Sequence, residues 1–204
     1  MNRHLRLAVA AVMALGLAAC NMPVTDEPLI PPDAPGNLHF RDGVWSMESR
    51  CEGDLIPSGA CNPRTDRFRV KDDNWGSLEP ESSDDVGIEQ QETAIEDGNP
   101  AIMQFRTDLG EGKWNYMFMA LEVIARDENG ALTSAKAWPI WCHPPRDNRK
   151  DANPPQLFPG MAPRDQDLCQ PADTRALRLA AGLTRRYVEV YALDYLGPEA
   201  ATAP

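Results

Sequence analysis

The sequence has little positive charge with which to attract a polyanion. It holds 20 Lys and Arg against 31 Asp and Glu, so its formal net charge is -11. No cluster of basic residues stands apart from this acidic excess. A nucleic-acid duplex would therefore be repelled by the folded body, and we expect no nucleic-acid partner.

Catalytic motifs are also scarce. The sequence has no Gly-x-Ser-x-Gly elbow, phosphate loop, dinucleotide fingerprint or haem motif, and beyond the first twenty residues its histidines are His39 and His143. A serine or cysteine nucleophile needs a base beside it, so a hydrolase of that kind is disfavoured. Glu48, Glu52 and Glu122 lie near apolar residues and leave open an alternative, an envelope enzyme that cuts cell-wall glycan or peptide.

Metal-binding spacing is missing as well. Cys142 and His143 are adjacent and precede two prolines, which is not the two-residue spacing of a zinc site. The segment from Asp72 to Asp97 carries ten acidic residues and no Lys or Arg, but it contains no twelve-residue calcium loop with Gly at its sixth position. We expect a mobile, solvated acidic loop there, and neither a metal nor another cofactor.

The single long hydrophobic run lies at the start of the chain. Arg3 and Arg6 precede a run from Leu7 to Ala19, which as a helix spans about 20 Å, too short for a hydrocarbon core of roughly 30 Å. This pattern is typical of a secretory signal. The run ends in Leu17-Ala18-Ala19-Cys20, which resembles the lipobox of bacterial lipoproteins. The resemblance implies a diacylglycerol on the Cys20 sulfur, cleavage before Cys20 and acylation of the freed amine.

The residue after Cys20 bears on localisation. It is Asn21 rather than Asp, which in sorting rules of the enteric type implies passage to the outer membrane. Two or more acyl chains hold a protein at a membrane stably. Loss of residues 1–19 would leave 185 residues with 18 basic and 31 acidic side chains, a net charge of -13. We expect the lipid-anchored domain to face the periplasm.

Residues 20–37 contain five prolines and few residues that could form a core. This composition predicts a semi-rigid tether that, at about 3.1 Å per residue, could hold the domain roughly 50 Å from the bilayer. Residues 38–204 are then expected to form one periplasmic domain.

The rest of the chain predicts an α+β domain, mainly an antiparallel β-sheet with a C-terminal helix and two disulfides. Asp173 is a suitable N-cap for a helix that runs to about Arg186, with Leu177, Ala180 and Leu183 on one face. A continuation of that helix through Tyr195 is the rival to a final strand. Alternation and turn residues predict strands at Gly43–Ser49, at Phe68–Val70, at Ala101–Arg106, in a Trp114–Ala137 hairpin turning at Asp127–Gly130, and at Val188–Leu196.

Four cysteines besides Cys20 indicate two disulfides in an exported chain, and three pairings are open. We predict Cys51 with Cys61 and Cys142 with Cys169, because short loops close at the least entropic cost. On a chain-entropy model these bonds would contribute roughly 3 and 3.5 kcal/mol.

Two tryptophans offer a candidate binding surface. Trp138 and Trp141, with the neighbouring prolines, could form an aromatic platform for a sugar or a peptide. Packing in a core next to a disulfide is the commoner role for tryptophan in such a position.

Several features together suggest a resemblance. They are the lipobox, Gly43-Val44-Trp45, the Cys51 and Cys61 pair, the stretch from Trp141 to Pro145, and Cys169 before a terminal helix. With them the chain resembles uncharacterised lipoproteins of alphaproteobacteria, which implies a small disulfide-bearing periplasmic domain and no transferable catalytic residues. The function expected is a non-enzymatic envelope module that binds a protein or a cell-wall component.

Overall fold

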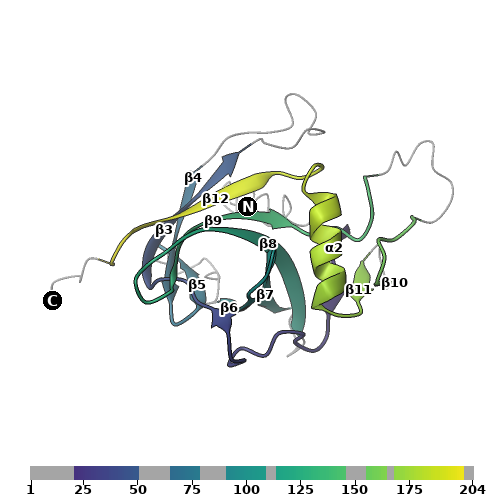
Figure 1. Ribbon diagram of the computed structural model, residues 1–204, viewed down its shortest axis with the longest axis horizontal. Coiled ribbons are helices and arrows are strands. Elements are labelled where there is room, and N and C mark those ends of the chain that lie inside the picture. Colours follow the sequence, from purple (N-terminus) through teal and green to yellow (C-terminus); the bar gives the residue numbers. More distant parts are fainter. Residues whose placement is uncertain are drawn as a thin grey trace, which may run out of the picture.

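The computed structural model describes residues 21–50, 65–78, 91–108, 114–145, 155–164 and 168–199. Its centre is a closed barrel of eight antiparallel strands, in the order β3-β4-β5-β6-β7-β8-β9-β12 and back to β3 (Figure 1). The expected α+β class with a helix beside a sheet is therefore wrong. The described part of the chain is mostly antiparallel β-structure with one short helix.

The barrel strands and the elements around them have the following bounds. The barrel consists of β3 (Gly43–Arg50), β4 (Thr65–Lys71), β5 (Asn74–Ser77), β6 (Gln91–Glu96), β7 (Ala101–Asp108), β8 (Trp114–Arg126), β9 (Leu132–Pro139) and β12 (Val190–Gly197). Outside it lie β1 (Val24–Thr25), β2 (Asn37–Leu38), β10 (Met161–Pro163), β11 (Cys169–Pro171) and α2 (Thr174–Thr184). Figure 1 shows α2 against one side of the barrel, with the β10–β11 hairpin beyond it.

The last strand, β12, closes the barrel. Its Tyr191 lies opposite Ser49 of β3 on one side and opposite Ala137 of β9 on the other. The final segment is thus a strand, and the rival continuation of the helix is wrong. Closure of an eight-stranded barrel leaves an interior just wide enough for side chains.

Alternate residues of each barrel strand divide between two cores. The inward-facing residues fill the barrel, where Trp45 and Leu121 are fully buried. Outward-facing residues of β7, β8 and β9 form a second core under α2, in which Ile102 and Phe118 pack against Leu177. Aromatic side chains dominate the interior at the end where β3 begins: Phe40, Trp45, Phe68, Trp75 and Tyr195.

The helix begins where the sequence predicts. Asp173 has an extended backbone, and its carboxylate accepts a hydrogen bond from the Ala176 amide at 2.8 Å. The buried face differs from the expected one, because Leu183 is 40% exposed. Small residues bring the helix close to the sheet, and the buried face consists of Ala176, Leu177, Ala180, Ala181 and Thr184.

The acidic segment is not a single solvated loop. Its first residues, Asp72 and Asp73, have φ angles of 49° and 58° and make the tight turn between β4 and β5. Its last residues form β6, where Ile95 is buried inside the barrel. The expectation failed because Ala94 and Ile95 are apolar and pack in the two cores, one on each side of β6, despite the surrounding charge. Residues 79–90 of the segment lie outside the described residues.

The proline-rich segment packs on the barrel from its first described residue. β1 pairs with β8, so that Val24 lies opposite Met117, and Ile30 is only 2% exposed. This segment packs on the barrel because burial of the apolar side chains of Met22, Val24 and Ile30 is favourable. Proline is compatible with an extended path at a sheet edge. Residues 21–37 therefore do not extend away from the domain as a tether.

One of the two predicted disulfides is present in the described residues. Cys142 and Cys169 are joined, with their Cα atoms 5.8 Å apart. The bond ties the segment after β9 to β11. Cys51 and Cys61 lie outside the described residues. No helix in the described part of the chain is long and apolar enough to cross a membrane.

Candidate functional site

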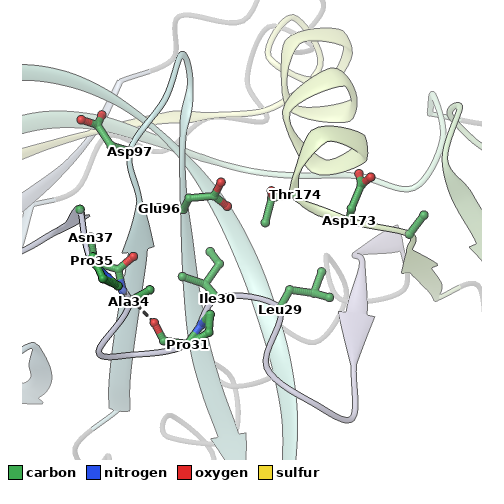
Figure 2. Close-up of a pocket in the computed structure, with 12 residues that line it drawn as sticks. Leu29, Ile30, Pro31, Ala34, Pro35, Asn37, Glu96, Asp97, Asp173 and Thr174 are labelled. Carbon is green, nitrogen blue, oxygen red and sulfur yellow. Dashed lines mark hydrogen bonds between the residues drawn. The ribbon is translucent and has the colours of Figure 1, made fainter.

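A cleft of about 540 Å³ lies on the outside of the barrel (Figure 2). One wall is the segment Leu29–Asn37, which contributes apolar and proline side chains. The opposite wall is formed by Glu96 and Asp97 at the end of β6 and by Ala172–Thr174 at the start of α2. The cleft thus combines an apolar wall with an acidic one.

The acidic groups of the cleft are held by partners. Glu96 forms an ion pair with Arg178 at 3.2 Å, and Asp97 pairs with Arg126 at 3.3 Å. Arg178 also donates to the backbone carbonyl of Asp97 at 2.8 Å, which joins the end of β6 to α2. These contacts fix the shape of the acidic wall. The paired arginines also neutralise part of its negative charge.

A buried glutamine holds the opposite wall. The Gln104 side-chain oxygen accepts from the amides of Leu29 and Ile30 at 2.7 and 3.0 Å, and its amide donates to the Ile30 carbonyl at 2.9 Å. Gln104 itself is only 3% exposed. The wall is therefore pre-formed. Sequence reasoning missed Gln104 because no local pattern announces a contact between residues 74 positions apart.

The two tryptophans proposed as a platform do not lie side by side on the surface. Trp138 is 2% exposed, its indole nitrogen donates to the Ala181 carbonyl at 3.0 Å, and it belongs to the core under α2. Trp141 is half-buried and stacks on Tyr187 with ring centroids 6.4 Å apart. Core packing thus describes Trp138, and the partly buried Trp141 packs against the same core.

Residues considered for catalysis are dispersed. Glu122 pairs with Arg185 at 2.6 Å, and Glu48 pairs with Arg50 at 3.5 Å. Glu52 lies outside the described residues. His39 is hydrogen-bonded to the Asp73 carboxylate at the β4–β5 turn. The described residues include no group of three or more His, Cys, Asp or Glu side chains placed to hold a metal.

The start of the described chain is firmly held. The Asn21 side-chain oxygen accepts from the amides of Cys142 and His143, both at 3.2 Å, and its amide donates to the His143 carbonyl at 3.0 Å. The Asn21 backbone carbonyl accepts a further bond from the Cys142 amide at 2.9 Å. Asn21 is thus bound to the disulfide-bonded segment. Cys20 itself lies outside the described residues.

Comparisons of the chain with protein families, with curated proteins and with solved structures found no match.

Proposed function

We propose that the protein is a non-enzymatic binding module of the bacterial cell envelope, anchored in the outer membrane by lipid on Cys20 with its barrel in the periplasm. The lipobox at Leu17–Cys20 supports the anchor, and Asn21 supports the outer membrane as destination. The cleft between Leu29–Asn37 and the start of α2 is the place where it binds an envelope protein or a cell-wall component.

The observation that carries the proposal is the attachment of Asn21 to Cys142 and His143. Because Asn21, the residue next to the proposed acylation site, is bound to the domain, the lipid would hold the domain close to the membrane. The buried, hydrogen-bonded cleft wall adds a preformed surface, which lowers the ordering cost of binding. The alternative, an envelope enzyme acting on cell-wall glycan or peptide, has no specific observation in its favour.

The anchor is tested by Cys20→Ser. We expect the wild-type protein to incorporate labelled palmitate and to sediment with outer membranes, and the variant to do neither. Glu27→Ser is the control, because Glu27 is exposed and the substitution leaves both the acylated sulfur and Asn21 unchanged. Equal recovery of Cys20→Ser in the membrane fraction would contradict the anchor.

Binding in the cleft is tested by filling it. Ala34 lines the cleft, whereas Ala162 lies exposed on β10 and does not. Envelope components captured from detergent-solubilised cells by the wild type and by Ala162→Trp should be lost with Ala34→Trp. Capture of the same components by all three proteins would show that binding occurs elsewhere.

A further inference from the structure

The outer face of α2 carries an apolar row that no other part of the described chain covers. Leu179 and Leu183 are 48% and 40% exposed, and their spacing of four residues places them on the same side of the helix. Arg175 lies one turn before Leu179 and is exposed. Arg186 follows Leu183 and is also exposed. The row thus reads Arg, Leu, Leu, Arg along the surface.

The arginines of this row differ from the other arginines of the helix. Arg178 and Arg185 are engaged by Glu96 and Glu122. Within the described residues, Arg175 and Arg186 form no ion pair, although Arg186 donates to the Tyr187 hydroxyl at 3.0 Å. In a chain whose formal charge is -11, this face therefore presents uncompensated positive charge beside exposed leucine.

Aromatic side chains continue the row toward Asn21. Tyr187, with Arg186 over its ring, stacks on Trp141. The Trp141 amide donates to the Thr184 hydroxyl at 3.2 Å, which joins the end of α2 to this segment. The next residue, Cys142, is the one that Asn21 holds. The end of α2, through the buried Thr184, is therefore linked to the segment that holds Asn21.

We infer that this face of α2, defined by Arg175, Leu179, Leu183, Arg186 and the Trp141–Tyr187 pair, rests on the bilayer in which the lipid of Cys20 is inserted. Leucines that enter the headgroup boundary, flanking arginines and an aromatic pair are the composition of interfacial helices. The net negative charge of the rest of the chain favours this face, because anionic headgroups repel acidic surfaces and attract arginine. The inference rests on the anchor proposed above.

The test places a tryptophan on this face and another away from it. Leu183→Trp reports on the row, and Leu179→Trp is a second probe of the same row should the first variant not fold. Ile124→Trp is the control, because Ile124 is 54% exposed and lies near the β8–β9 turn, at the opposite end of β9 from Trp141. Each variant adds one exposed indole to the same five native tryptophans.

The full-length lipidated proteins are purified in detergent and reconstituted into phosphatidylcholine–phosphatidylglycerol vesicles with brominated acyl chains. We expect the fluorescence added at residue 183 to fall by about half, as for an indole at the headgroup boundary, and that added at residue 124 to stay unchanged. Equal quenching at both positions, or none at 183 in protein that floats with the vesicles, would overturn the orientation alone. Protein that does not float would overturn the anchor and the orientation together.

Discussion

Gln104 shows how much one buried polar side chain can organise. It satisfies two backbone amides and one carbonyl of the segment that forms a cleft wall, and it does so from the middle of a barrel strand. A buried amide without a partner costs free energy comparable to a lost hydrogen bond. The position of the Leu29–Ile30 backbone is therefore set by this side chain as well as by the burial of Ile30.

Gln104→Leu should lower the free energy of unfolding by about 1–3 kcal/mol, because leucine of similar size leaves the Leu29 and Ile30 amides without an acceptor. Urea denaturation measures the loss, and hydrogen exchange should show the Ile30 amide exchanging faster. Gln170→Leu makes the same chemical change at an exposed position of β11 and should be close to neutral. Equal effects of the two substitutions would remove Gln104 from this role.

Residue-level predictions from sequence succeeded where the cause is local. Asp173 was identifiable as an N-cap because its side chain bonds a backbone group three residues ahead. Core packing of Trp138 was expected, but its hydrogen bond to Ala181 was not, because α2 lies more than thirty residues later. The hydrogen bonds of Gln104 with Leu29 and Ile30 were not predicted for the same reason: their partners are distant in the sequence.

At the scale of elements, six of the eight barrel strands followed from alternation and turn residues, whereas β5 and β6 lie in the acidic segment that was expected to be a loop. The β8–β9 hairpin turns at Asp127, whose carboxylate accepts from the amides of Asn129 and Ala131, and Gly130 has a φ of 85°. The helix was predicted, and so were Leu177 and Ala180 on its buried face, but Leu183 is exposed. Periodicity alone favours leucine as the buried residue, whereas close approach to the sheet selected alanine and left Leu179 and Leu183 outside.

Two glycines should respond in opposite ways to alanine. Gly182 lies within α2, and an added Cβ there would meet nothing within 4 Å, so Gly182→Ala should stabilise the protein by about 0.5–1 kcal/mol. Gly43 begins β3 with a φ of 141°, and an added Cβ would clash with the Gly197 carbonyl and the Tyr195 ring. Gly43→Ala should therefore destabilise it by about 1–3 kcal/mol. Thermal and urea denaturation measure both changes, and each variant is a control for the other. Shifts in stability of the same sign for both variants would contradict the prediction.

At the scale of the molecule, barrel closure was not predictable from local pattern. The sequence indicates the strands, but closure depends on the pairing of β12 with both β3 and β9. Val190 lies opposite Arg50, so this pairing joins residues 140 positions apart in the chain. No turn or alternation encodes such a pairing, which is why an antiparallel sheet with a C-terminal helix was expected and a closed barrel was not. The packing of residues 21–37 was not predicted either. Their prolines indicated an extended tether, whereas a few apolar residues among them are buried against the barrel.

The attachment of Asn21 also determines how an anchored barrel would search for partners. An extended proline-rich tether of about 50 Å would let an anchored domain reach partners well away from its membrane. Because residues 21–37 are folded against β8 and Gln104, an anchored domain would instead stay within about its own thickness of the membrane surface. Encounters would then occur by lateral diffusion in two dimensions, so a partner has to reside in, or come down to, the same membrane surface.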